Sequence, residues 1–169
     1  MSHAVCASRD AASAAKCGLA GDVLRSFGSL RFVATGWSML PTIWPGDTLL
    51  VDRINPDQIR EGDVVLAARD GRLCAHRVVS KPPRSGNAHW ITQGDAMPAP
   101  DRPVAEGELL GRVNYLIRAG RLIKLRAELS ATERLTAKVV RRSFVAARAL
   151  VYMRNTLQTP KEAGLPCQG

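Results

Sequence analysis

The feature that most constrains the fold is a series of six short runs rich in β-branched and aliphatic residues, with turn residues between them. Runs of this length, bounded by glycine, proline and aspartate, are typical of β-strands. They cover residues 31–35, 48–52, 63–68, 72–79, 89–92 and 108–113. We therefore expect a mainly β protein built on a small antiparallel or mixed β-domain.

One hairpin can be specified to the residue. Asp70-Gly71 is a two-residue loop of the kind that favours a type I′ turn. In that register Arg69 faces Arg72 and Val65 faces His76, and side chains then alternate between the two faces of the hairpin. A histidine in the middle of a strand is more often a satisfied core or surface residue than a catalyst, so both interpretations stay open at this point.

A serine lies in a corner rich in glycine and proline, directly before a predicted strand. The corner reads Gly36-Trp37-Ser38-Met39-Leu40-Pro41-Thr42 and is followed by Pro45-Gly46-Asp47. Such a corner can hold a nucleophile, and main-chain N–H groups that splay out there can stabilise an oxyanion. Serine, proline and glycine also make ordinary turns, so the corner alone does not decide between the two.

Two aspartates lie on a stiff loop between residues 94 and 103. Gly94-Asp95 opens the loop, three prolines follow, and Asp101 comes six residues after Asp95. Prolines exclude regular structure there. The loop is either a plain surface turn or a rigid mount for a carboxylate that orients a histidine.

In their order and spacing, the serine corner, the strand with His76 and the loop with Asp95 and Asp101 resemble the motifs of the signal peptidase I superfamily of serine endopeptidases. This superfamily includes the LexA-type self-cleaving repressors. The resemblance covers residues 31–114. It is nearest to the Ser–His form of the endoplasmic-reticulum and archaeal signal peptidases, because the base position reads His76-Arg77-Val78 where the usual bacterial enzymes carry lysine. The family fold is a curled β-domain, in agreement with the predicted strands.

The resemblance implies a role for each site residue. Ser38 matches the nucleophile, His76 the general base, and Asp101 the carboxylate that orients the histidine. Asp95 matches a structural or auxiliary carboxylate, and Gly36, Met39 and Pro41 are the auxiliary residues of the serine corner. A histidine base is mostly neutral near pH 7 but needs its tautomer fixed, so a Ser–His enzyme should carry an orienting aspartate.

Three departures from the family pattern bear on the prediction. The membrane-spanning segment that precedes the serine in the family is missing, since residues 19–32 contain Asp22, Arg25 and Arg31. Gly36 stands where many bacterial signal peptidases have a hydroxyl residue that helps to stabilise the oxyanion, and the resulting Gly-x-Ser-Met corner is closer to the LexA-type form. Ala96 replaces the asparagine often found after Gly-Asp, which puts the usual hydrogen bonding of that loop in doubt.

The net charge of +9 is concentrated towards the C-terminus, where residues 112–154 carry eleven Lys or Arg against Glu128 and Glu133. Beyond Gly111 the pattern reads as helical. Ser130–Glu133 fits a capping box that opens a basic amphipathic helix. This helix could lie on an anionic membrane or pack on its own domain with a solvated basic face. Nucleic acid is less favoured, because no aromatic residues are interleaved for stacking.

The ends of the chain carry weaker signals. Residues 1–17 are rich in alanine and serine and predict a loose arm or frayed helix, followed by a short helix that ends at Gly28. The four cysteines lack C-x-x-C spacing, so we expect no metal site, and nothing in the sequence calls for a cofactor. With no membrane span or signal segment, we expect a cytoplasmic or peripheral membrane location. The predicted segments are 1–30 (arm and helix), 31–114 (peptidase domain), 115–157 (basic helical extension) and 158–169 (flexible tail).

The leading hypothesis is a serine endopeptidase that cleaves exported or precursor peptides. A self-cleaving regulator is the first alternative, because Ala20-Gly21, the kind of bond that LexA-type proteins cut, lies upstream of Ser38. A non-catalytic module that uses the same scaffold and its basic helix on membranes is the second.

Overall fold

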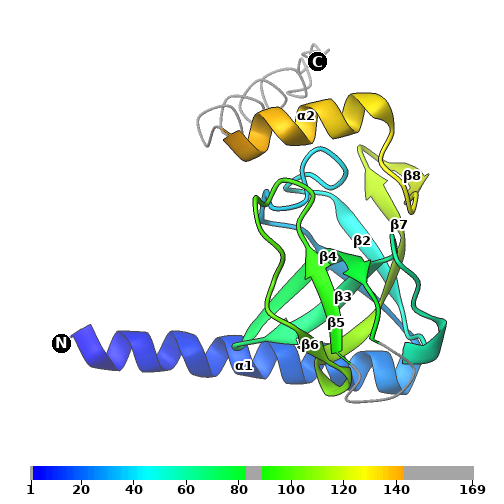
Figure 1. The fold of residues 1–169 in the computed structure, drawn as a ribbon. Helices are drawn as coiled ribbons and strands as arrows, with labels where there is room; N and C mark the ends of the chain where they lie inside the picture. The colour runs from blue at the N-terminus through cyan, green and yellow to red at the C-terminus, as the bar shows by residue number, and fades with distance from the viewer. Residues whose placement is uncertain (1, 83–88, 143–169) are drawn as a thin grey trace, which may run out of the picture.

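The computed structural model describes residues 2–82 and 89–142, with backbone only for residues 2–12. Two helices flank a curled sheet: α1 (Ser2–Phe27) lies along one end of it, and α2 (Ala131–Arg142) lies over the opposite end (Figure 1). The strands are β1 (Ser29–Val33), β2 (Thr48–Asp52), β3 (Val64–Arg69), β4 (Arg72–Ser80), β5 (His89–Gln93), β6 (Val104–Ala105), β7 (Leu109–Arg118) and β8 (Arg121–Lys124). Two short 3₁₀ helices, Pro56–Gln58 and Glu106–Glu108, complete the fold.

The strands form one antiparallel system in the order β1-β2-β7-β3-β4-β5-β6, with β8 paired to β7. Irregular register in three of the strand pairs accompanies the curl of the sheet, as β-bulges strengthen twist. The predicted mainly β fold is therefore confirmed. Each of the six predicted strands corresponds to an observed one, with ends that differ by up to five residues.

The predicted hairpin is confirmed to the residue. Val65 pairs with His76 and Arg69 pairs with Arg72. Asp70 and Gly71 both have positive φ, 49° and 70°, as a type I′ turn requires. This register decides which face of β4 carries the histidine.

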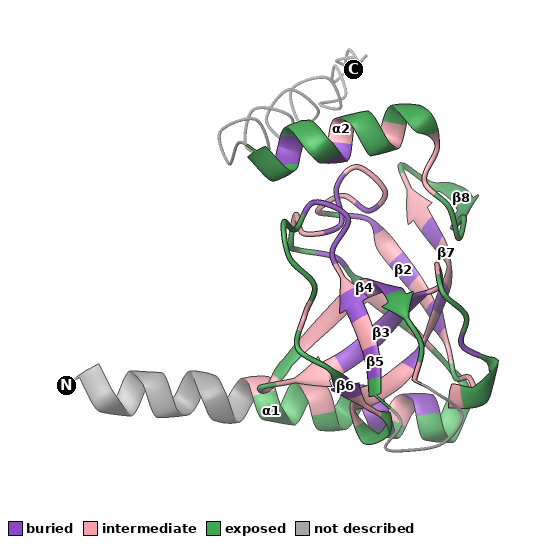
Figure 2. Cartoon of the chain, viewed as in Figure 1, coloured by how far each residue is buried: buried purple, intermediate pink, exposed green. Residues whose placement is uncertain are grey.

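Two apolar clusters fill the two sides of the sheet, and Figure 2 shows their buried residues along the central strands. The larger cluster gathers side chains from α1, the serine corner, β2, β3 and β7, among them Leu24, Met39, Leu49, Leu66 and Leu116. The smaller one includes Val65, Val78 and Trp90. Met39 thus anchors the serine corner in the main core, at 3% exposure.

Two sequence expectations about the flanking segments are corrected. The N-terminal region is one continuous helix of 26 residues, α1, where a loose arm or frayed helix followed by a separate short helix was expected. It does end as predicted: Gly28, with φ 74°, donates its N–H to the carbonyl of Leu24. Ala20 and Leu24 pack into the domain, which explains why this end is ordered.

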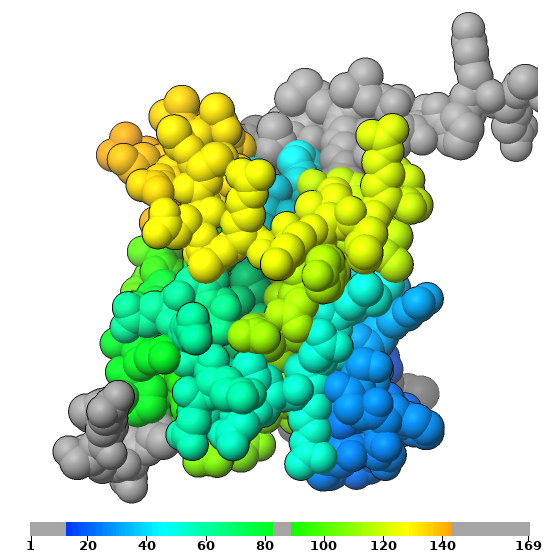
Figure 3. Space-filling view, turned by 90° about the vertical axis from the view of Figure 1, so that its right-hand side faces the viewer, coloured from blue at the N-terminus to red at the C-terminus, as the bar shows by residue number. Residues whose placement is uncertain are grey.

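The expectation of a helical extension from residue 115 is wrong for residues 115–124. Strand β7 continues to Arg118, across the expected boundary at 114, and a turn at Ala119-Gly120 leads into β8. Figure 3 views this face, with the residues of β8 and of the segment leading into α2 at the surface in yellow-green and yellow. The basic residues from 112 to 124 therefore belong to the sheet rather than to a helical appendage. Strand β7 pairs with β2 and β3, which lie far away in the sequence. Strand formation of this kind depends on tertiary context, so the local pattern of residues did not predict it.

Helix α2 begins with the predicted capping box. Ser130 N–H donates to the Glu133 carboxylate at 2.8 Å, and Glu133 N–H donates to Ser130 Oγ at 3.3 Å. The hydrogen bond from the Ser130 main chain, and then the one from the Ser130 hydroxyl, lower the pKa of Glu133 against the opposing effect of its burial. The rest of the predicted amphipathic helix, including Phe144, Arg148 and Val151, and the predicted tail 158–169 lie outside the described residues.

Candidate active site

The serine corner is the connection between β1 and β2, and its two ends are tied together by main-chain bonds. Ala34 N–H donates to the carbonyl of Asp47, and Gly46 N–H donates to that of Ala34. Asp47 is buried at 1% exposure and forms an ion pair with Arg118 of β7 at 2.6 Å. The corner is therefore fixed to the sheet at its base, while Ser38 at its tip stays half-buried.

The main chain of Ser38 is held by the Gly94-Asp95-Ala96 loop. Ala96 N–H donates to the carbonyl of Ser38 at 2.8 Å. Gly94 lies so close to that carbonyl that a β-carbon at position 94 would be 2.5 Å from Ser38 O. The bond uses a main-chain group of Ala96, so the loop holds the serine although asparagine is absent from position 96.

His76 lies on β4 between the serine and the second aspartate. Its Nε2 is 2.9 Å from Ser38 Oγ, and its Nδ1 is 2.6 Å from Asp101 Oδ2. A carboxylate only accepts hydrogen bonds, so Nδ1 carries the proton and Nε2 is left to accept the serine hydroxyl proton. The structure thus brings together Ser38, His76 and Asp101, which are far apart in the sequence.

Asp101 is held by Thr92 as well as by the histidine. Thr92 Oγ1 donates to Asp101 Oδ2 at 2.6 Å, and the Asp101 N–H donates to the carbonyl of Thr92. Burial raises the pKa of Asp101, but the hydrogen bonds from His76 and Thr92 and the charges of His76 and Arg69 outweigh it and bring that pKa below its ordinary value. Asp101 is therefore ionised and directed at the imidazole at neutral pH.

Asp95 has a different partner, since it forms a buried ion pair with Arg77. The guanidinium donates to both carboxylate oxygens, at 2.8 and 2.9 Å, and Thr42 Oγ1 donates to Oδ2 at 2.5 Å. The side chains are only 9% and 3% exposed. Neighbouring side chains on a strand point to opposite faces. His76 therefore binds Asp101 on one face of the sheet, and Arg77 binds Asp95 on the other.

Helix α2 closes over this second side. Val140 is buried in a small cluster with Leu40 and Ala96, and Arg141 Nε donates to the main-chain carbonyl of Asp95 at 3.0 Å. In its described part, the helix packs on its own domain through Ala137 and Val140. The C-terminal helix thereby covers the serine corner and the Gly94-Asp95-Ala96 loop on this second side.

The auxiliary residues of the corner take separate places. Met39 is buried, Pro41 is half-buried and follows a cis peptide bond, and Gly36 is exposed with no atom within 4 Å of where a β-carbon would lie. Within the described residues, the N–H groups of Ser38 and Met39 donate no hydrogen bond to protein. These two N–H groups are available for an oxyanion.

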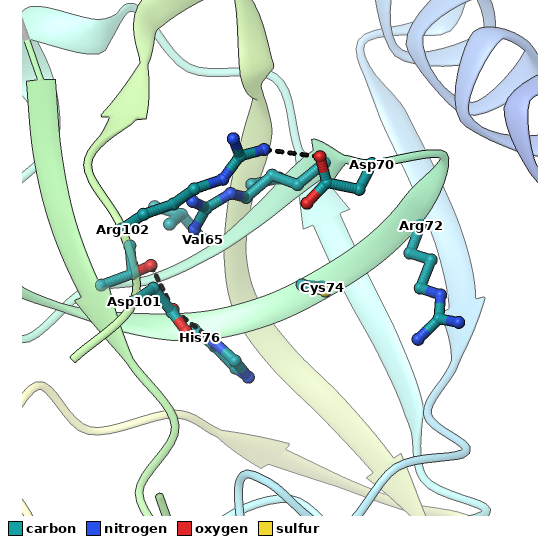
Figure 4. Close-up of a pocket in the computed structure, with 10 residues that line it drawn as sticks. Val65, Asp70, Arg72, Cys74, His76, Asp101 and Arg102 are labelled. Atoms are coloured by element: carbon teal, nitrogen blue, oxygen red, sulfur yellow. Dashed lines mark hydrogen bonds and ion pairs between the residues drawn. The ribbon is translucent and has the colours of Figure 1, made fainter. Parts of the chain in front are cut away.

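A pocket of about 450 Å³ lies beside His76 and Asp101, bounded by the β3–β4 hairpin (Figure 4). Cys74 lies within it on the same face as the histidine. Burial, followed by the negative charge of Asp101, raises the pKa of Cys74, so this thiol stays protonated and is a poor nucleophile. In the described part of the chain, His, Cys, Asp and Glu residues form no group of three that could hold a metal ion.

Five residues of the site region were not predicted from the sequence in these roles: Thr42, Thr92, Arg77 as the partner of Asp95, and the Asp47–Arg118 pair that fixes the corner. Threonine and arginine carry no motif that distinguishes such positions from ordinary strand residues. The alternation of side chains along the predicted strand did indicate that Arg77 lies on the face of the hairpin opposite to His76.

Residues 20–101 match the family described as Peptidase S24-like. The matched segment contains Ser38, His76 and Asp95 and ends at Asp101. The match supports the LexA/signal peptidase-type superfamily of serine peptidases, the broader group that the sequence motifs indicated. The comparison with curated proteins gives no match. No helix among the described residues has both the length and the apolar character needed to cross a membrane.

Proposed function

We propose that the protein is a serine endopeptidase of the Ser–His signal peptidase type that cleaves exported or precursor peptides. The observation that carries the proposal is the position of the His76 ring, with one nitrogen 2.9 Å from Ser38 Oγ and the other 2.6 Å from Asp101 Oδ2. A hydroxyl, an imidazole and a carboxylate in this arrangement are the parts of an acyl-transfer site.

In the proposed mechanism, His76 Nε2 takes the hydroxyl proton of Ser38 as Oγ attacks the carbonyl carbon of the scissile peptide bond. The Ser38 N–H, with the Met39 N–H as the neighbouring donor, stabilises the oxyanion. The imidazolium, stabilised by Asp101, then gives its proton to the leaving amine. Water, activated by the same histidine, hydrolyses the acyl-enzyme and restores Ser38.

The direct test is covalent labelling by a fluorophosphonate probe, which reacts with activated serines. We expect labelling of Ser38 in the wild type, its loss in Ser38→Ala, and a decrease of at least about 10³-fold in His76→Ala, because members of such a unit act together. Ser80→Ala, at an exposed serine of β4, is the matched control and should label normally. Equal labelling of the wild type and the Ser38→Ala protein rejects the proposal.

Self-cleavage is the second candidate, favoured by the Peptidase S24-like match. The Ala20-Gly21 bond lies inside α1, and Ala20 is only 5% exposed. A protease binds its substrate chain in an extended form, so this helix would have to unwind before the bond could reach Ser38. Intact mass after incubation at alkaline pH decides the matter: a new species cut after residue 20 supports self-cleavage, and one unchanged species rejects it.

A further inference from the structure

The pocket beside His76 is floored by one face of the β3–β4 hairpin. Three cross-strand pairs lie in a row along it: Val65 opposite His76, Ala67 opposite Cys74, and Arg69 opposite Arg72. Since side chains alternate along a strand, these six residues share a face, and all of them line the pocket. We call this space the hairpin pocket.

The hairpin pocket has one end at His76 and Asp101, next to Ser38 but not lined by it, and a basic end at Arg69 and Arg72. The middle pair, Ala67 and Cys74, has small side chains, which leave space for a ligand between the two ends of the pocket. Figure 4 shows Arg72, Cys74 and His76 along one strand, with the side chains of Arg72 and His76 on the same side of it. Four residues of strand place the basic end about 13 Å from the histidine, a distance that an extended peptide covers in about four residues.

The charges at the basic end are only partly balanced by the protein, through the longer-range interaction of Arg69 with Asp101. Arg102 forms an ion pair with Asp70 at 2.7 Å, and the Asp101 carboxylate accepts hydrogen bonds from His76 and Thr92. Among the described residues, neither Arg69 nor Arg72 has an ion pair.

Arg69 and Arg72 are nevertheless direct cross-strand neighbours, and like charges placed opposite each other destabilise a sheet. The Nη2 atom of Arg69 is also buried without any hydrogen-bond partner, and a buried donor left unpaired costs free energy. A bound anion would relieve both defects at once.

We infer that the basic end of the hairpin pocket binds the carboxylate of a glutamate or aspartate in the peptide substrate, about four residues from the scissile bond. The inference rests on the proposed function and names a specificity for it. A guanidinium binds a carboxylate through paired, charge-assisted hydrogen bonds, which a side-chain amide reproduces poorly. The pocket therefore selects acidic side chains over their neutral isosteres.

The test uses the full chain and a set of 14-residue peptides with a central Ala-Ala bond, each carrying one glutamate or, in its twin, one glutamine at a single position. We expect wild-type kcat/KM to favour glutamate by about tenfold at a position three to five residues from the cut bond, a modest difference in binding free energy. Arg69→Gln and Arg72→Gln should each lower this ratio towards one.

Arg121→Gln, an exposed residue of β8 outside the pocket, removes the same charge and should keep the ratio. A wild-type ratio of one at all positions, or a ratio unchanged in both pocket variants, overturns the inference even if the peptides are cleaved.

A binding measurement separates this failure from failure of the proposed function. Fluorescence anisotropy with the Ser38→Ala protein and labelled twin peptides needs no turnover. Tighter binding of the glutamate twin, lost in Ser38→Ala/Arg72→Gln, supports the hairpin pocket even if the wild type never cleaves a peptide. Equal affinity for the twins in the Ser38→Ala protein rejects it.

Discussion

Gly94 packs directly against the carbonyl group of Ser38, so closely that a β-carbon at position 94 would lie 2.5 Å from the Ser38 oxygen. The contact joins the Gly-Asp loop to the serine corner, and the Ala96 N–H bond to the same carbonyl completes it. Gly94 itself has no positive φ, so close approach and not backbone conformation is what requires glycine there. The position of the candidate nucleophile thus depends on a residue 56 places later in the chain.

We predict that Gly94→Ala displaces the serine corner. Either the loop or Ser38 must move, because both the Ser38 carbonyl and the Met97 side chain lie under 3.0 Å from the added methyl group. Overpacking of this kind costs about 1–3 kcal/mol of unfolding free energy. Fluorophosphonate labelling of Ser38 should slow by more than about tenfold, since a small misplacement at a reacting centre has large effects. Gly107→Ala, where nothing lies within 4 Å, is the control and should behave as wild type.

Asp101→Asn should lower the rate of acyl transfer by up to about 10⁴-fold, as the loss of the orienting aspartate does in serine triads. The amide can donate to Nδ1 and so favour the wrong tautomer of His76. Single-turnover rates with a cleaved peptide measure the effect, and circular dichroism checks the fold. A variant with wild-type rates would remove Asp101 from the mechanism.

The same variant tests the lowered pKa of Asp101. A carboxyl group whose pKa is lower in the folded protein stabilises the fold above its unfolded value near 4, and this contribution disappears as the pH falls through the folded value. The difference in unfolding free energy between wild type and Asp101→Asn should therefore shrink as the pH is lowered from about 5 to 3. Urea denaturation across this range measures it. A difference that grows towards acid pH contradicts the lowered pKa.

The two carboxylate–arginine pairs of the loop and the hairpin offer a matched comparison of stability. Asp95→Asn leaves Arg77 buried and charged without its partner, and we expect a loss of about 3–5 kcal/mol of unfolding free energy. Asp70→Asn breaks a pair whose side chains are 76% and 59% exposed, and asparagine tolerates the positive φ of the turn. That loss should be within about 1 kcal/mol. Equal decreases in the denaturation midpoints of Asp95→Asn and Asp70→Asn would show that burial of the Asp95–Arg77 pair does not increase its contribution to stability.

Contact of the C-terminal helix with anionic lipid also stays a prediction. The described part of α2 buries Val140 but leaves Leu135 and Val139 exposed, at 65% and 53%, beside a basic surface. We expect co-sedimentation with phosphatidylserine vesicles, weak binding to neutral ones, and a decrease of at least about tenfold in Leu135→Glu/Val139→Glu, since each buried apolar side chain contributes more than 1 kcal/mol.

Leu122→Glu, at an exposed leucine of β8, is the control for this helix surface. Lipid binding that is unchanged in the α2 variant, or equal on neutral and anionic vesicles, would count against a membrane role for the helix.

Local signals in the sequence were enough for most of the sheet. An Asp-Gly turn and flanking alternation predict the β3–β4 register to the residue, because a two-residue loop leaves only one way to pair its strands. The helical pattern expected from residue 115 was wrong up to residue 124, where β7 continues in pairs with strands far away in the sequence and β8 follows. The turn that follows places Ala119 at a φ of 49°, a conformation for which alanine gives no signal.

For the candidate site, the sequence alone determined which chemical groups are present and on which strand face or stiff loop each one stands. Only the tertiary structure decided how those groups pair: Asp101 with His76, Asp95 with Arg77, and the Ser38 carbonyl with the 94–96 loop. The physical reason is that residue type and local spacing act over a few residues. The choice between two aspartates on one loop depends on how a curled sheet brings β4, β5 and the serine corner within hydrogen-bond distance.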